Sequence, residues 1–358
     1  FYSDSYPHEQ EHTDTRFFNL KAHINNTILD IDSSLFYRRH SDKFILDSNR
    51  PNWYVNYHTS YSYGADLETL KRLSWGTLSA GAGILEEKIS STNLGEHKRD
   101  SQAVYAQLQS LKDKRASYDL GLRLDHYQTW GWQTSPSLSL GYEVIPQLRL
   151  KTSGGYSFRI PSFTELYYSS PANVGNEDLT PEKAWSGELG LDYAHNKFSA
   201  ELNYFRRWAE DLIGWARASS NLAWGAQNFA EVDTEGIEVE FAYAGISTGY
   251  TFQDLNSSVT GLNTKYTLDF LQHHAFLGLN LEFAQDIMQS VRFSYKQRKG
   301  QRPYFLIDTR LSKRIEKEDD FDLELFLDVT NLLNTSYSEQ GNVRMPGRWV
   351  MGGVRLRR

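Results

Sequence analysis

Aromatic and amide side chains in segments that we expect to be loops are the residues of this sequence best suited to chemistry. Rigid amphipathic rings offer a large contact area at low entropy cost, which suits the binding of planar or bulky ligands. For Trp132, and equally for Trp208, the alternative is a place in an aromatic belt at a membrane surface. The candidate ligand-binding residues are Tyr127, Trp130, Trp132, Tyr167, Tyr168, Asn176, Trp215, Asn221 and Trp224.

Acidic side chains could supply the hard oxygen ligands that Ca²⁺ prefers, but their spacing does not match a calcium-binding loop. Solvated acidic loops are therefore the favoured interpretation, with a loop Ca²⁺ as the alternative and no other cofactor expected. The residues concerned are Asp4, Glu9, Glu11, Asp14, Glu177 and Asp178.

Catalytic patterns are absent from the sequence. It has no Gly-x-Ser-x-Gly or His-Glu-x-x-His motif and no phosphate-binding glycine pattern. His273 and His274 would point to opposite faces of a strand, so they cannot chelate one metal ion. We expect a protein that is not an enzyme, although a Ser–His pair matched only in space stays an alternative.

Composition excludes several classes. The 358 residues carry 38 Lys+Arg against 45 Asp+Glu, a net charge of −7, which argues against a nucleic-acid binder. The absence of Cys excludes disulfides and thiolate zinc sites. No apolar run approaches the roughly 18 residues of a transmembrane helix. The mean hydropathy of −0.58 suggests a soluble protein, but 22 Tyr and 9 Trp do not fit that conclusion.

Strict alternation of apolar and polar residues indicates the strands that must position the candidate ligand-binding side chains. For example, Leu120, Leu122 and Leu124 alternate with Gly121 and Arg123. Period two predicts half-buried strands, and we expect 17 of them in one all-β domain over residues 1–358. Short connections alternate with long polar connections along the chain. We expect the long ones near 39–52, 88–101, 126–134, 159–182, 208–232, 253–271, 296–303 and 331–346.

Alternating short and long connections predict an antiparallel up-and-down meander with two different rims. A transmembrane β-barrel combines this pattern with an apolar outer face, a polar lumen and aromatic girdles, so its average hydropathy looks soluble. A soluble sandwich or propeller is the alternative. Strands that often reach ten or more residues favour the barrel, because strands of globular proteins usually have about 5–6.

Two motifs give the sequence a family resemblance. Residues 158–166 have an aromatic-Arg-x-Pro-Ser-x-x-Glu-Leu pattern, and residues 175–182 have Gly-Asn-x-x-Leu-x-Pro-Glu. Together with residues 331–348 near the end of the chain, they resemble TonB-dependent outer-membrane receptors, most of all the corrinoid (vitamin B12) receptor-like branch. The motif residues are Arg159, Pro161, Glu165, Leu166, Gly175, Asn176, Leu179, Pro181, Glu182, Asn331, Pro346, Gly347 and Arg348.

The resemblance implies a bacterial outer-membrane barrel of 22 strands around a plug that carries the TonB box. The 17 strands expected here would form its C-terminal part, without the plug or the first five strands. Such barrels typically end in an aromatic residue, whereas this sequence ends Arg355-Leu356-Arg357-Arg358. Because the missing strands would leave two open edges, we expect residues 1–358 alone not to form a stable barrel.

The role of the two mid-chain motifs has two interpretations. Pro161 and Pro181 mark strand ends, and Arg159 and Glu182 could form a buried pair at the rim. The favoured interpretation is that these residues organise a long loop, and the alternative is direct contact with a ligand. No His lies between Phe158 and Glu182, which counts against the haem-binding branch of the family.

The resemblance implies a receptor whose long loops capture a scarce extracellular ligand, a corrinoid or a metal chelate such as an iron–siderophore, for energy-coupled uptake. Its implied partners are outer-membrane lipid, this small-molecule ligand, the TonB energy-coupling protein acting through a plug, and a surface lipoprotein, with no nucleic acid. The alternative is a passive porin-like or structural outer-membrane barrel.

Overall fold

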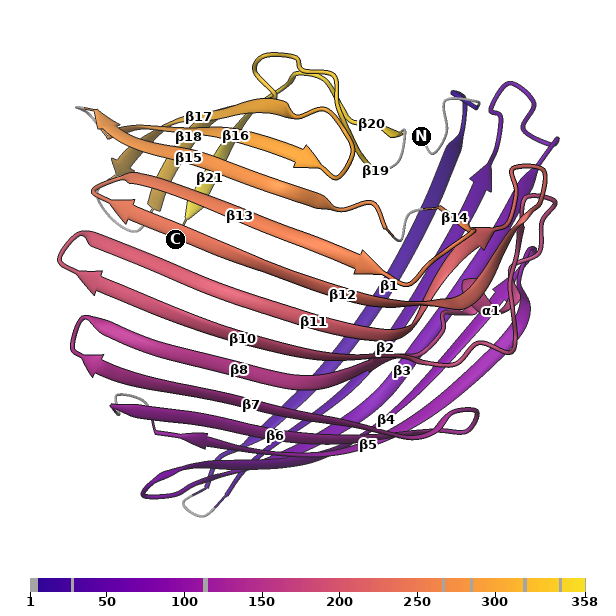
Figure 1. Cartoon of the computed structure of the whole chain (residues 1–358), viewed down its shortest axis with the longest axis horizontal. Helices are drawn as coiled ribbons and strands as arrows, with labels where there is room; N and C mark the ends of the chain where they lie inside the picture. The colour runs from indigo at the N-terminus through magenta and orange to yellow at the C-terminus, as the bar shows by residue number, and fades with distance from the viewer. Residues whose placement is uncertain are drawn as a thin grey trace.

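The chain folds, in a computed structural model, into one large curved sheet whose long strands are antiparallel, with a separate two-stranded sheet and a short helix (Figure 1). The structure describes residues 6–26, 29–111, 115–265, 268–283, 286–317, 321–340 and 343–357. Within these residues no helix combines the length and the apolar character needed to cross a bilayer.

Within the described ranges, 17 long strands confirm the expected number and the up-and-down order, since each pairs antiparallel with the next long strand in the chain. They are β1 (Gln10–Ile24), β2 (Asp30–Ile45), β3 (Val55–Arg72), β4 (Gly76–Ser91), β5 (Gly95–Ser110), β6 (Ala116–Tyr127), β7 (Gly131–Ile145), β8 (Leu148–Arg159), β10 (Glu182–His195), β11 (Phe198–Arg217), β12 (Trp224–Tyr243), β13 (Ile246–Ser257), β15 (Leu271–Phe283), β16 (Ile287–Arg298), β17 (Tyr304–Lys317), β18 (Phe321–Thr330) and β21 (Trp349–Arg357).

Short elements decorate one end of this sheet. They are helix α1 (Phe163–Tyr167) and strands β9 (Asn173–Val174), β14 (Asn263–Thr264), β19 (Ser338–Gln340) and β20 (Val343–Arg344). We call this end, which holds the connections 160–181, 218–223 and 258–270, the loop end. The opposite end, with tight connections such as 146–147 and 196–197, is the turn end. Figure 1 shows α1 and β14 together at the loop end.

The sheet has an apolar face and a polar face, as the alternation predicts. Leu120 pairs with Leu138 and Tyr118 with Leu140, and both of these β7 leucines are exposed. Residues between them in sequence, such as Asp119 and Ser139, line a cleft on the other face. The buried apolar residues lie mostly at the loop end. The apolar face of the sheet is large and exposed, so it requires a non-aqueous surrounding.

Three of the expected loops are largely strand. Residues 88–101, 126–134 and 208–232 were expected to be connections, but the connections there shorten to 92–94, 128–130 and 218–223. The backbone ladders of β4–β5 and β6–β7 continue into polar sequence, where the apolar alternation has ended, and the β11–β12 ladder continues past a register shift that interrupts the alternation. The prediction was wrong because hydrogen bonding between strands requires neither an apolar face nor an unbroken alternation.

The described residues do not close the sheet into a barrel. Among the long strands β1 pairs with β2, and β21 with β18, so each has one unpaired edge. Figure 1 shows the two edge strands apart from each other, β1 in indigo and β21 in yellow. The open edges agree with the sequence-based expectation.

Candidate ligand-binding site

A guanidinium bound to two carboxylates holds the loop end together. Arg159, at the end of β8, donates to both oxygens of Glu182 at 2.8 and 2.7 Å and to both oxygens of Glu165 at 2.9 and 3.0 Å. Glu182 is the register partner of Arg159 on β10, while Glu165 comes from α1. We call these three residues the carboxylate clamp, and it fixes the helix over the junction of two strands.

Helix α1 begins with a reciprocal cap. The Ser162 hydroxyl accepts from the Glu165 backbone N–H at 3.2 Å, and Glu165 accepts from the Ser162 backbone N–H at 2.8 Å. Burial opposes ionisation of Glu165, but the hydrogen bonds from Arg159 and Ser162 outweigh it and lower the pKa of that carboxyl. Hydrogen bonds to Glu182, and also to Glu165, raise the pKa of Arg159 despite burial. Arg159 and Glu165 are therefore both charged at neutral pH.

The second motif packs against this helix through its backbone. The Asn176 N–H donates to the Glu165 carbonyl at 2.9 Å, and the Gly175 N–H donates to the Tyr168 carbonyl at 2.7 Å. A Cβ on Gly175 would lie 2.6 Å from the Leu166 carbonyl oxygen, so the close approach requires glycine. The motif thus closes the 160–181 connection onto α1.

A small apolar core lies beneath this connection. Leu166, Leu179, Ile213 and Ala226 are buried together, and we call them the loop-end core. Trp130, Tyr167 and Trp215 pack against it. Pro161 is fully buried nearby, and its carbonyl accepts from Arg99 at 2.8 Å. Leu166, Leu179 and Pro161 thus have packing roles, which supports the interpretation that the motifs organise the loop.

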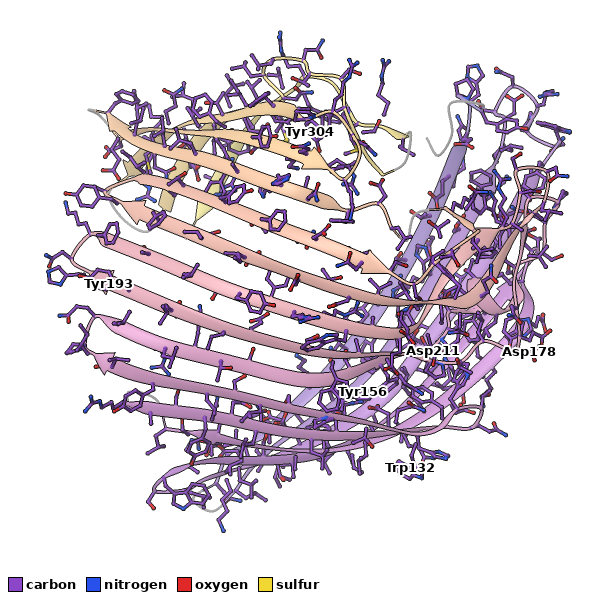
Figure 2. All side chains as sticks on the ribbon, in the orientation of Figure 1. Trp132, Tyr156, Asp178, Tyr193, Asp211 and Tyr304 are labelled. Carbon is purple, nitrogen blue, oxygen red and sulfur yellow. The ribbon has the colours of Figure 1, made fainter. Side chains whose placement is uncertain are left out.

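A β-bulge connects β11 to the clamp. The register of β11 against β12 shifts after Ala209, and Asp211 adopts a positive φ of 55°. The bulge lets the Ile213 N–H donate to Glu182 at 2.7 Å. On the partner strand, the Asn228 side chain binds both the N–H and the carbonyl of Thr180 at 2.9 Å. Figure 2 shows Asp211 and Asp178 at the same end of the molecule.

The predicted ligand residues divide between two places. Trp130 donates its indole N–H to the Leu179 carbonyl at 3.1 Å and lies 6.1 Å from the Tyr127 ring, at the loop end. Trp132 is 65% exposed and packs on His126 instead. It shares the alternation of Leu138 on β7, so it lies on the apolar face, and Figure 2 shows it projecting from the sheet. Trp132 is therefore separated from the other candidates.

Trp208 lies on the apolar face as well. It pairs in register with Trp185, which contacts Tyr156 at a ring distance of 5.1 Å. These three rings form a cross-strand row near the loop end, the arrangement of an aromatic girdle.

The tip of the β11–β12 hairpin carries three further candidates, Trp215, Asn221 and Trp224, and Tyr168 contacts the first of them. Trp215 meets Tyr168 edge-on at 6.3 Å, and Trp224 begins β12. Both tryptophans are strand residues and not loop residues, because the hairpin ladder reaches them. Tyr167 stacks on His97 with ring centroids 3.4 Å apart, and Asn221 bonds to Ser219 in the turn.

The tip also carries cations that the sequence did not single out. The guanidinium of Arg217 lies 4.1 Å from the centre of the Trp224 ring, and the Lys265 ammonium lies 6.0 Å from it. Arg217 lies within 208–232, which the sequence predicted to be a connection, so its place on β11 two residues after Trp215 was not predicted. The position of Lys265 depends on the short strand β14, which no sequence pattern marks.

The acidic residues show no metal site. Within the described ranges, no group of three or more His, Cys, Asp or Glu side chains could hold a metal ion. Asp14 lies 3.3 Å from Arg16 and 3.4 Å from Arg39, while Glu177 and Asp178 are exposed. Glu9 and Glu11 lie at the start of the chain, Glu11 within β1. Asp4 lies outside the described residues, and the loop Ca²⁺ stays an untested alternative to solvated acidic loops.

Comparison with known proteins identifies the family to which this chain belongs. Residues 2–332 match the family described as TonB dependent receptor-like, beta-barrel. The chain belongs to this TonB-dependent receptor family. Membership agrees with the outer-membrane location expected from the sequence and with a barrel whose apolar face meets lipid.

Curated relatives of this receptor barrel are transporters and receptors. This chain is 26% identical over 273 residues to the vitamin B12 transporter BtuB of Photobacterium profundum, and the match covers 71% of this chain and 42% of that protein. It is 31% identical over 101 residues to the ferric enterobactin receptor of Pseudomonas aeruginosa, covering 24% and 14%. The chain thus spans less than half the length of these relatives.

Solved receptor structures share the fold. A mutant form of the ferric enterobactin receptor PfeA of Pseudomonas aeruginosa superposes with a TM-score of 0.75 at 15% identity, over 96% of this chain and 61% of that one. The FrpB iron transporter of Neisseria meningitidis gives 0.75 at 15% identity, over 96% and 63%. At this identity the likeness concerns the fold alone.

The receptor barrel's last motif lies apart from the clamp, in the β18–β21 connection. Asn331 is buried with a positive φ of 48°, and its side chain donates to the carbonyls of Thr335 and Pro346 at 2.9 and 3.3 Å. The Arg348 backbone N–H donates to the Asn334 side chain at 2.9 Å, and a Cβ on Gly347 would lie 2.6 Å from that oxygen. These residues fix the final hairpin connection.

Proposed function

We propose that this chain is the barrel portion of an outer-membrane receptor whose loop end captures a scarce extracellular ligand, of the corrinoid or iron–siderophore type, for energy-coupled uptake. The observation that carries the proposal is the family match over residues 2–332. The names of the relatives, a vitamin B12 transporter and a ferric enterobactin receptor, support both ligand types.

The loop end supplies what capture requires. The carboxylate clamp and the loop-end core hold the 160–181 connection in one conformation, so aromatic residues such as Trp215 and Tyr168 are pre-positioned. Pre-organisation limits the entropy lost when a ligand binds. Release then needs a second state of lower affinity, because a ligand bound equally in both states shifts nothing.

The proposed partners follow from this role. Energy for release comes from the TonB protein acting through a plug encoded elsewhere in the receptor, and a surface lipoprotein is a further proposed partner at the loop end. The candidate contact residues stay those proposed from the sequence, with Trp132 the least favoured because it lies on the apolar face.

The test uses the intact receptor from the gene that contains this chain. We expect saturable calorimetric binding of either cyanocobalamin or a ferric tris-catecholate, and uptake of the bound ligand that stops when TonB is deleted. Steady conductance in planar bilayers without saturable binding of either probe would support the porin-like alternative and contradict the proposal.

A further inference from the structure

Two cations share the tip of the β11–β12 hairpin with one indole ring. Arg217 stacks on Trp224 at 4.1 Å, and its Nη1 donates to the carbonyls of Ser220 and Leu222 at 2.9 and 3.3 Å. Lys265 lies 6.0 Å from the same ring and donates to the Asn173 side-chain oxygen at 3.1 Å. Segments far apart in sequence thus converge here.

Strand pairing fixes this convergence. β14 pairs with the end of β11 through Ala216 and Arg217, and β9 pairs in parallel with the start of β12 through Trp224. We call the four segments β9, β12, β11 and β14 the tip sheet. Its pairings place Asn173 beside Trp224 and Arg217 beside β14, and the Lys265 N–H donates to the Trp215 carbonyl at 2.9 Å.

The guanidinium of Arg217 is only partly satisfied by the described part of the tip sheet. Among the described residues, no carboxylate lies within ion-pair distance of Arg217, and its covered Nε has no acceptor. Burial, and then the positive charge of Arg217, lowers the pKa of Lys265. Two like charges beside one ring repel each other, and a bound anion close to both would offset that repulsion and supply an acceptor to Arg217.

We propose that Arg217 and Lys265 form an anion-binding subsite beside Trp224 and Trp215, for a ligand that joins an anionic group to a flat or bulky ring system. The inference rests on the proposed capture function and narrows its ligand class. Two sources offer this chemistry: a corrinoid with its phosphodiester, and a ferric complex of catecholates. The indole rings take the apolar surface, while the two cations take the anionic group.

The experiment measures binding to the intact receptor with two pairs of probes. One pair is cyanocobalamin and dicyanocobinamide, which lacks the phosphodiester. The other is the anionic ferric tris-catecholate and a cationic ferric trihydroxamate. We call the member of each pair that carries the phosphodiester or the catecholate charges the anionic probe, after that group and not after its net charge. Within the pair that binds, we expect preference for the anionic probe and weaker binding at higher salt.

Substitutions assign that preference to the two cations. Arg217→Gln and Lys265→Gln should each weaken binding of the anionic probe about tenfold or more, because a charge-assisted hydrogen bond is lost, and should flatten its salt dependence. Arg217→Lys should recover part of the loss. The matched control is Arg302→Gln, an exposed cation of the 299–303 connection, which should leave affinity unchanged. Heat-modifiable gel migration verifies that each variant is folded.

The outcomes separate the two proposals. If the intact receptor binds an anionic probe and both Gln variants keep its affinity and salt dependence, the subsite is overturned while the capture function stands. Equal binding of both members of a probe pair by the unsubstituted receptor also overturns the subsite. Absence of saturable binding for all four probes contradicts the proposed function and the subsite with it.

Discussion

Arg159 is the residue on which the loop end depends most directly. Its guanidinium satisfies two carboxylates, and the Glu165 and Glu182 side chains are only 14% and 9% exposed. Buried carboxylates without a counter-charge are costly, so removing the arginine has a larger effect than the loss of one surface ion pair. The packing and charge of this motif support the interpretation favoured from the sequence, that it organises a long loop.

Arg159→Met should therefore loosen the 160–181 connection. Breaking a buried ion pair costs about 3–5 kcal/mol, and we expect about 2 kcal/mol here because the Arg159 side chain is 44% exposed and partly screened. Limited proteolysis of the intact receptor should show about thirtyfold faster cleavage within this connection. Arg206→Met, which breaks a pair with Asp233 alone, is the matched control and should have little effect on that cleavage. Equal cleavage of both variants would count against the clamp.

The charge of Glu165 gives the clamp a pH dependence with a definite sign. Its folded pKa lies below the ordinary value of 4.5, so its contribution to stability is fully present above pH 4.5 and is lost as pH falls through the folded pKa. Hydrogen exchange of the α1 amides, corrected for intrinsic rates, should accelerate on acidification below that value. Glu165→Gln should remove most of this pH dependence, and an unchanged profile would contradict the assignment.

At the scale of elements, the β11 bulge joins strand geometry to the clamp. Asp211 has a positive φ of 55°, a conformation that glycine adopts readily and that Asp tolerates better than a β-branched residue. The bulge turns the Ile213 N–H toward Glu182, so its conformation matters for the clamp.

Asp211→Val should destabilise the intact receptor by about 1–2 kcal/mol, because a β-branched side chain is strained at positive φ. Asp211→Gly should be nearly neutral. Urea unfolding followed by tryptophan fluorescence measures both, with the neighbouring Glu210→Val, at ordinary φ, as the control. A Val variant as stable as the Gly variant would show that the bulge does not hold this conformation.

Most of the elements were predictable, and the reasons for the failures are physical. Alternation identified all 17 long strands that the described residues contain, because one face is apolar in each of them. Strand ends at the loop end were missed, since residues such as Lys98 and Arg99 on β5 are polar on both faces. The two-residue strands β9 and β14 carry no periodic signal, so the position of Lys265 beside Trp224 was not predictable.

For the whole molecule, the open edges decide how the chain behaves alone. β1 and β21 each have one unpaired side within the described residues, and unsatisfied backbone groups in lipid cost several kcal/mol each. The apolar face is large, so exposure to water is not an alternative to lipid.

Residues 1–358 refolded alone in detergent should therefore not give the heat-modifiable gel migration of a closed barrel, whereas the intact receptor should. Gel migration of boiled and unboiled samples measures this, and the intact receptor taken through the same refolding serves as the control. Heat-modifiable migration of the 358-residue chain would mean that it closes with fewer strands.

The tip sheet has a consequence for the transfer of a binding specificity from one receptor to another. Its four strands draw the connections 160–181, 218–223 and 258–270 into one hydrogen-bonded unit. A change of length in one of these segments should therefore disturb the strand pairing of the others. The unit that an engineer must graft to transfer a binding specificity is this three-segment assembly rather than a single loop.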